Sequence, residues 1–181
     1  MGLDSRARYT RMVIEEAFLT LLQEKAMAKI TVTELCLVAD INRATFYKHY
    51  QDIPDLMEKI EARIFDNLTE TLILVPNSDL NTFLSDILRN IQLNADRYIV
   101  LGSDNGDPGL AVKAFLTCYE KAYPLLVRNL PHMSPDKQRM MYHFLAQGCG
   151  GVLTHWIHEG MQTEPEEVVA FILEICKRVV K

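Results

Sequence analysis

The residues of this sequence best suited to binding another molecule gather in one short segment that carries two cations, two hydroxyls and a histidine. At 100° per residue of a helix, Phe46 and Tyr50 point to one side and leave a polar face opposite. That outward face and its flanks comprise Arg43, Ala44, Thr45, Tyr47, Lys48 and His49.

This face suits a helix that lies in the major groove of double-stranded DNA. A small residue such as Ala44 permits close approach, and Arg43 or Lys48 can reach the acceptors of guanine. The hydroxyls and the histidine can hold phosphates. The alternative is a solvated face on a short core helix, and periodicity alone does not choose between the two.

The elements that position this segment are predicted to be helices throughout. Apolar residues recur at intervals of three and four, and no run of alternating β-branched residues predicts a strand, so the expected fold is all-α. The expected helices span 5–24, 32–39, 42–50, 52–74, 79–94, 95–101, 110–130, 135–159 and 164–181.

Capping signals define the two short helices and the start of the long one. Thr31 and Glu34 fit a capping box, and Asn42 and Asp52 are good N-cap residues. Leu35 and Val38 are expected to point inward from the helix over 32–39. Two short helices packed on a longer preceding one predict a helix-turn-helix head.

Charge divides unevenly between this head and the rest of the chain. The formal net charge is −5, which argues against coating nucleic acid by bulk charge. Residues 1–50 carry 7 basic and 6 acidic side chains, so an anionic partner approaches there without net repulsion. We expect a helix-turn-helix DNA-binding domain over 1–52 and a helical regulatory and dimerisation domain over 53–181.

The segment 31–50 resembles the DNA-binding domain of TetR/AcrR-family transcriptional regulators. The resemblance lies in the turn Ala39-Asp-Ile-Asn42, in Thr45-Phe-Tyr-Lys-His-Tyr50, and in the apolar pairs of the first helix. It implies DNA reading by Thr33, Arg43, Ala44 and Lys48, and contacts to the DNA backbone by Thr45, Tyr47 and His49. Asp40 replaces the usual glycine of the turn, and Asp tolerates a left-handed conformation better than most residues.

The end of the chain resembles a C-terminal domain found in a branch of TetR-like regulators, whose last two helices pair with those of a second subunit. Glycines within the helix over 135–159 predict a close helix approach, with Ala146 and Gly150 one turn apart. The candidate dimer interface comprises Ala146, Gly150, Trp156, Val168, Phe171, Ile172 and Ile175. The alternative is that these residues form intrachain core.

No glycine-rich phosphate loop, nucleophile elbow or metal spacing marks the C-terminal part. The family precedent is a ligand pocket among the middle helices, where the candidates are Tyr98, Phe115, Tyr119, Tyr123 and His143. Aromatic residues at this spacing also occur in ordinary cores. The four cysteines, Cys36, Cys118, Cys149 and Cys176, are expected to be inert thiols.

These observations predict a homodimeric, cytoplasmic transcriptional regulator that binds double-stranded DNA and acts as a repressor. A small molecule or a partner protein is expected to control it, without cofactor, metal or membrane association. The alternative is a helical co-regulator that docks on another regulator and binds DNA weakly alone. An enzyme is not expected, because no nucleophile is paired with a base in the sequence.

Overall fold

The computed structural model describes residues 2–74, 80–117, 119, 123, 124, 127 and 130–180. Within these ranges the chain is helical and forms no strand, which confirms the predicted all-α fold. The helices are α1 (Gly2–Glu24), α2 (Val32–Val38), α3 (Arg43–Tyr47), α4 (Ile53–Leu74), α5 (Leu80–Leu93), α6 (Ala95–Leu101), α7 (Leu110–Thr117), α9 (Pro135–His158) and α10 (Pro165–Val180). Much of the predicted helix over 110–130 lies outside the described residues.

The N-cap predictions for α2, α3 and α4 are confirmed. The amide of Glu34 donates to Thr31 Oγ1 at 3.2 Å, and the amide of Thr45 donates to Asn42 Oδ1 at 2.7 Å. The amide of Asp55 donates to Asp52 Oδ1 at 2.8 Å. Each bond satisfies an amide that the first helical turn leaves without an intrahelical partner. The three caps fix where the elements of the head begin.

The turn between α2 and α3 explains one wrong prediction. Asp40 takes φ 50°, the left-handed conformation that its position in the turn requires. Because α2 ends at Val38 and the chain reverses directly after it, only Leu35 and Cys36 are buried from this helix. Val38 was expected inward but is 47% exposed, because the buried face of this segment passes through Leu35, Cys36 and Ala39 and leaves Val38 to one side.

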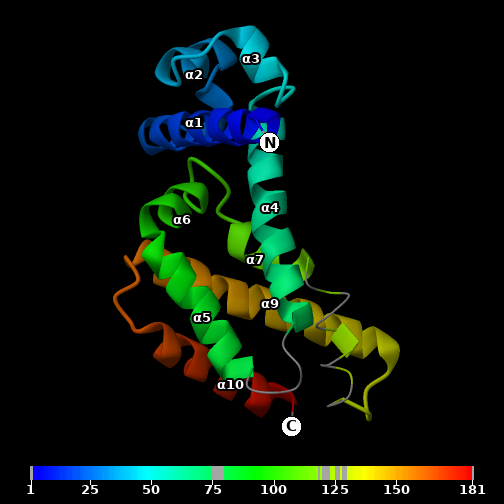
Figure 1. The fold of residues 1–181 in the computed structure, drawn as a ribbon. Helices are drawn as coiled ribbons and strands as arrows, with labels where there is room; N and C mark the ends of the chain where they lie inside the picture. Colours follow the sequence, from blue (N-terminus) through cyan, green and yellow to red (C-terminus); the bar gives the residue numbers. More distant parts are fainter. Residues whose placement is uncertain are drawn as a thin grey trace.

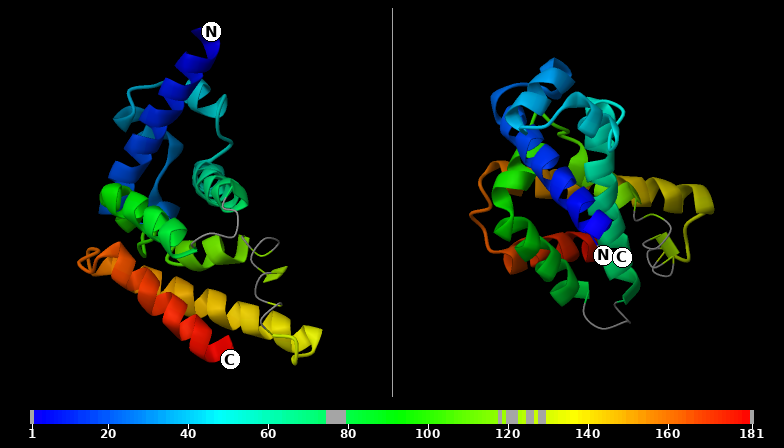
Figure 2. Two further views of the ribbon diagram at one scale, coloured as in Figure 1. Left: turned by 60° about the horizontal axis from the view of Figure 1, so that its bottom comes forward. Right: turned by 45° about the horizontal axis from the view of Figure 1, so that its top comes forward.

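The molecule has a head and a body joined by α4 (Figure 1). The head holds α1, α2 and α3 at one end, and α4 runs from it along the body. In the body, α7 packs along α9, and α5 packs along α10. Figure 2 shows α9 and α10 side by side at the end of the molecule away from the head. The DNA-binding candidates and the dimer candidates therefore lie at opposite ends.

Two hydrophobic cores support this arrangement. The first unites α1, α2 and α3 with α4 and with Val100, Leu101 and Leu110 of the body. The second joins α5, α9 and α10 around Trp156 and Val169. The first core contains residues from both sides of residue 52, so hydrophobic packing is continuous across the predicted domain boundary. None of the described helices combines the length and apolar character needed to cross a membrane.

The close helix approach predicted at Gly150 is present between α7 and α9. A Cβ atom built on Gly150 would lie 2.5 Å from Val112 Cγ2 and 2.8 Å from Val112 Cα. Backbone atoms cannot move aside as a flexible side chain can. Gly150 therefore sets the distance between the two helices, which offsets the helix propensity that glycine lacks.

We expect Gly150→Ala to lower the free energy of unfolding by about 1–3 kcal/mol through overpacking, although Ala favours an isolated helix. Gly148→Ala is the matched control, because its Cβ would meet no atom within 4 Å. Urea unfolding followed by circular dichroism measures both variants. Equal stability of Gly150→Ala and Gly148→Ala would show that α7 does not constrain α9 at this point.

Candidate nucleic-acid interface

The faces predicted for the segment around α3 are those found. Phe46 and Tyr50 are buried, with 0% and 2% of their surfaces exposed. None of the candidate DNA-binding residues is fully buried. Two are half-buried, Thr45 and His49, and the others are exposed: Thr33, Arg43, Ala44, Tyr47 and Lys48. One polar surface thus covers α3 and the adjoining part of α2.

Aromatic packing holds α3 against the rest of the head. The ring of Phe46 meets Tyr47 edge to face with centroids 5.5 Å apart, and its centroid lies 5.7 Å from that of Tyr50. The Tyr50 hydroxyl donates to Glu15 Oε1 of α1 at 3.3 Å. Burial raises the pKa of Tyr50, so this phenol keeps its proton near neutral pH. The inner face of α3 is therefore anchored in the core of the head, and its outer face is exposed.

Charged side chains extend this anchor into the body. The carboxylate of Glu15 pairs with Arg63 of α4, and its second oxygen accepts a hydrogen bond from Arg97 of α6 at 3.2 Å. A single buried carboxylate thus connects α1 of the head to α4 and to α6. These two ion pairs couple the position of the head to that of the body.

A hydrogen bond along α3 holds the side chain of Arg43 in place. Arg43 Nη2 donates to the Tyr47 hydroxyl at 3.2 Å, one helical turn away. This hydrogen bond raises the pKa of Arg43, which is fully exposed and remains a cation. Because the guanidinium is held along the helix surface, less conformational entropy is lost when it binds a base or a phosphate.

A shallow hollow between α2 and the start of α3 brings predicted residues of both helices together. Its lining includes Thr33 of α2, Asn42 at the turn, and Arg43 of α3. The exposed side chain of Leu37 borders the same hollow. The arrangement gives one continuous surface on which Thr33 and Arg43 can contact the same ligand.

The sequence analysis missed one residue of this surface, Lys59 of α4. Its ammonium donates to the carbonyl of His49 at 3.0 Å and to Asp55 Oδ2 at 2.9 Å. Partial burial lowers the pKa of His49, and the cations Arg11, Lys48 and Lys59 lower it further. These three cations favour an anion beside His49. The spacing of Asp55 and Lys59 predicts an ion pair within one helix. The contact of Lys59 with His49 joins two different elements, and no sequence pattern predicts it.

Tyr142 of α9 connects four of the five pocket candidates. Its ring lies 4.8, 6.2 and 6.3 Å, between centroids, from the rings of Tyr119, Tyr123 and His143, and its hydroxyl donates to the carbonyl of Phe115. Tyr119 stacks on Tyr123 with centroids 4.7 Å apart. Tyr98 and Phe115 pack on the core between α5, α9 and α10, and His143 is exposed on α9. The assignment of the five candidates to an effector pocket stays a prediction.

The seven interface candidates divide by exposure. The subunit itself covers five of them: Ala146, Gly150, Trp156, Val168 and Ile172 are buried in the single chain. Trp156 additionally donates its indole N–H to the carbonyl of Thr163 at 2.8 Å. Phe171 and Ile175 are 53% and 42% exposed. The intrachain core therefore accounts for the buried five, and Phe171 and Ile175 are left at the surface of α10.

No group of three or more His, Cys, Asp or Glu side chains that could hold a metal ion is present in the part of the chain that the structure describes. The polar surface over α2 and α3 instead offers cations, hydroxyls and a small residue on a rigid helix. This is the chemistry of nucleic-acid binding.

Comparison with known proteins agrees with this geometry. The TetR-type family model described as "Transcriptional regulator C-terminal region" matches residues 78–178, more than half of the chain. The chain is 38% identical over 72 residues to the uncharacterized HTH-type transcriptional regulator YxbF of Bacillus subtilis (strain 168). That match covers 37% of this chain and only 19% of the relative, so the chain spans a small part of that protein's length.

Solved structures show the same fold over nearly the whole chain. A TetR transcriptional regulator from Streptococcus agalactiae 2603V is 26% identical, with a TM-score of 0.70 and 96% of each chain covered. The dihydroxyacetone kinase operon activator DhaS is 21% identical, with a TM-score of 0.64 over 94% of this chain and 96% of that one. The fatty acid degradation regulator FadR of Bacillus halodurans is 11% identical, with a TM-score of 0.62 over 92% and 94%. With the family model and the helix-turn-helix head, these likenesses show that the chain belongs to the TetR family of transcriptional regulators.

Proposed function

We propose that this regulator is a homodimeric repressor that binds a near-palindromic DNA site and is released by a small molecule or a partner protein. The DNA-binding surface comprises Thr33, Arg43, Ala44, Thr45, Tyr47, Lys48 and His49. The observation that carries the proposal is the exposed polar face of α3 above the fully buried Phe46. In this proposal the DNA-binding domain spans 1–52 and the regulatory domain spans 53–181.

Within this surface, the residues divide between bases and phosphates. The small side chain of Ala44 allows α3 to approach the DNA closely, so that Arg43 and Lys48 reach the base edges in the major groove. Thr45, Tyr47 and His49 contact the DNA backbone at the edges of the groove. Arg11 and Lys59 add positive charge beside His49 and strengthen the attraction of phosphates.

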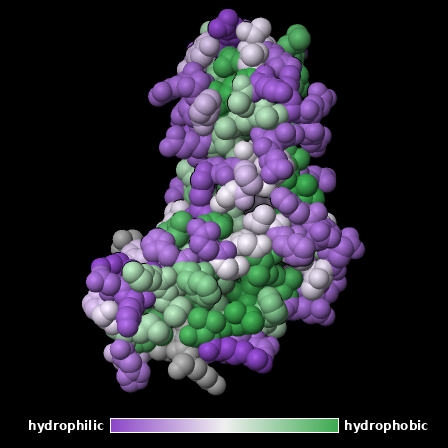
Figure 3. Space-filling view, turned by 180° about the vertical axis from the view of Figure 1, so that it is seen from behind, coloured by the Kyte–Doolittle hydropathy of each residue, from purple (hydrophilic) through white to green (hydrophobic). Residues whose placement is uncertain are grey.

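The proposed dimer supplies two such heads. One helix-turn-helix contacts a few base pairs, whereas a two-fold pair reads half-sites about 34–36 Å apart. Exposed apolar side chains one turn apart occur on both last helices: Met140 and Phe144 on α9, and Phe171 and Ile175 on α10. We call these four residues the α9–α10 face. Seen from behind, the lower end of the molecule carries a broad hydrophobic area (Figure 3), which supports burial against a second copy.

The route from body to head runs through α4. Lys113 of α7 pairs with Glu61 of α4 at 3.2 Å, and Arg63 of α4 pairs with Glu15 of α1. Through these two ion pairs, a displacement of α7 moves α4, and the displacement of α4 moves the head. An effector that binds the DNA-competent and DNA-incompetent positions of α4 unequally shifts the balance between them, and one that binds both equally has no effect.

Lys48→Ala tests the DNA-binding surface. A bound site is first selected from random DNA, and affinity for it is then measured by fluorescence anisotropy at a fixed salt concentration. We expect Lys48→Ala to weaken binding by about 10–100-fold, because a cation that contacts bases or phosphates is lost.

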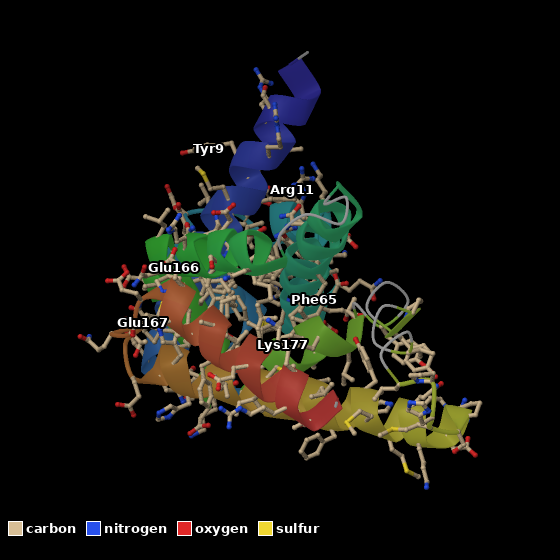
Figure 4. All side chains as sticks on the ribbon, turned by 90° about the horizontal axis from the view of Figure 1, so that it is seen from below. Tyr9, Arg11, Phe65, Glu166, Glu167 and Lys177 are labelled. Atoms are coloured by element: carbon tan, nitrogen blue, oxygen red, sulfur yellow. The ribbon has the colours of Figure 1, made fainter. Side chains whose placement is uncertain are left out.

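The matched control is Lys177→Ala, which removes the same charge from an exposed position on α10. Figure 4 labels Lys177 on α10, and Figure 1 shows α10 at the end of the molecule away from α3 and the rest of the head. Its affinity for the selected site is expected to equal that of the unaltered protein. If Lys48→Ala binds as tightly as Lys177→Ala, α3 is not the recognition helix.

A further inference from the structure

Two cysteines that lie far apart in the sequence meet in the body. Cys149 of α9 and Cys176 of α10 place their sulfur atoms 3.8 Å apart. The sequence analysis expected inert thiols because no partner was visible, and the fold supplies one. The pair lies where the last two helices pack together (Figure 2).

The two thiols differ in environment. Cys149 is buried with 9% of its surface exposed, and Cys176 is half-buried, so a small solute reaches Cys176 first. The thiol of Cys149 hydrogen-bonds to the sulfur of Cys176 and lowers the pKa of Cys176 to about 7. The same contact and burial raise the pKa of Cys149. Of the two, Cys176 is therefore the thiol that loses its proton more readily, and the thiolate is the nucleophilic form.

We propose that Cys149 and Cys176 are a redox site at which a hydroperoxide forms a reversible disulfide within one subunit. The Cys176 thiolate attacks the hydroperoxide, the O–O bond breaks, and the alkoxide that leaves takes up a proton as an alcohol. Cys176 is then a sulfenic acid. The Cys149 sulfur attacks it, the S–O bond breaks, and hydroxide leaves with the Cys149 proton as water. Two thiols lose two electrons, and the hydroperoxide gains them.

Closing this bond changes the packing of α9 and α10. A disulfide has an S–S distance of about 2.05 Å, so the sulfurs must approach by roughly 1.8 Å from 3.8 Å. Side-chain rotation and helix displacement share this movement, and helix shifts of 1–2 Å are those found in regulatory transitions. Cys176 is next to Ile175 of the α9–α10 face, so oxidation acts beside the proposed dimer interface. The disulfide itself does not depend on the proposed function.

The chain provides its own control thiol. Cys36 is buried in the head core, where burial raises its pKa, and α2 carries it far from α9 and α10. It is therefore expected to stay reduced while the pair reacts. Cys118 lies outside the described residues and is treated in the experiment as a competing partner.

The test uses the reduced, folded protein and a small molar excess of hydrogen peroxide. Remaining thiols are alkylated, and peptides are mapped by mass spectrometry without reduction. We expect the loss of two alkylatable thiols per chain, a peptide that joins Cys149 to Cys176, and full recovery with dithiothreitol. Cys36→Ser should lose the same two thiols. Cys149→Ser should accumulate a sulfenic acid on Cys176 that dimedone captures.

Three results would overturn the proposal. Cys149 and Cys176 could both remain alkylatable after peroxide treatment, either cysteine could be joined to Cys118, or the bond could link two subunits. Peptide mapping of the unaltered protein decides the first two outcomes without any variant. Non-reducing gel electrophoresis, which separates two cross-linked chains from a single chain, decides the third. Circular dichroism before and after oxidation establishes that the reaction occurs in the folded chain, and a Cys149→Ser variant that fails to fold leaves this mapping intact.

Discussion

Phe46→Ala is expected to lower the free energy of unfolding by about 3–5 kcal/mol, because it opens a cavity where the head core is closed on all sides. Phe46 is fully buried and belongs to the same core as Phe18, Leu35 and Leu56. It is the only buried side chain that α3 itself contributes. Loss of the ring therefore removes the contact that fixes the orientation of α3, the proposed recognition helix.

Thermal and urea unfolding measure this change, with Tyr47→Ala as the matched aromatic control. Tyr47 follows Phe46 directly but is 49% exposed, so its removal is expected to cost less than about 1 kcal/mol. The expected order for DNA affinity is the opposite. At temperatures where both variants are folded, Tyr47→Ala should weaken DNA binding more than Phe46→Ala, because Tyr47 belongs to the proposed contact surface. Equal unfolding curves for the two variants would show that α3 is not packed through Phe46.

Local signals were sufficient to predict the head. Asn42 and Asp52 have side chains that satisfy amides at helix starts, and that chemistry involves only residues three apart. The orientation of Phe46 and Tyr50 follows from helical periodicity, which needs only the helix and a core on one side. Two expectations for the head were wrong: Val38 lies beside the buried face of α2, and the helix expected over 42–50 ends at Tyr47.

Contacts between distant elements could not be predicted in this way. Lys59 reaches His49, and Glu15 reaches Arg97, only because α4 and α6 fold back against the head. The pairing of Cys149 with Cys176 likewise depends on how α9 and α10 pack. Periodicity reports which side of a helix is apolar and does not identify what covers that side.

This limit is clearest in the dimer candidates. Trp156 and Phe171 belong to equally apolar stretches of sequence, yet Trp156 is 5% exposed and Phe171 is 53% exposed. Core within one chain and interface between two chains have the same residue types and the same spacing. The fold separates the buried candidates from those that one subunit leaves exposed, and the exposed apolar side chains of the last two helices make up the proposed α9–α10 face.

Phe171→Asp is therefore expected to convert the proposed dimer to a monomer, because dimer formation would then bury an unpaired carboxylate among apolar side chains. Leu93→Asp is the matched control, since Leu93 of α5 is 84% exposed and lies outside the α9–α10 face. Sedimentation velocity should show a monomer for Phe171→Asp and a dimer for Leu93→Asp at the same concentration. Circular dichroism should be the same for both, because Phe171 contributes little to the subunit's own core.

Affinity for the selected palindrome then reports whether dimer formation is what makes binding tight. When one head is bound, the second head of a dimer faces its half-site at a high effective concentration, and this advantage is about 10²–10⁴-fold. Phe171→Asp should lose that factor on the palindrome and bind an isolated half-site as the unaltered chain does. A monomer that keeps full affinity for the palindrome would mean that the heads bind independently. A Phe171→Asp protein that remains dimeric would place the interface on another surface.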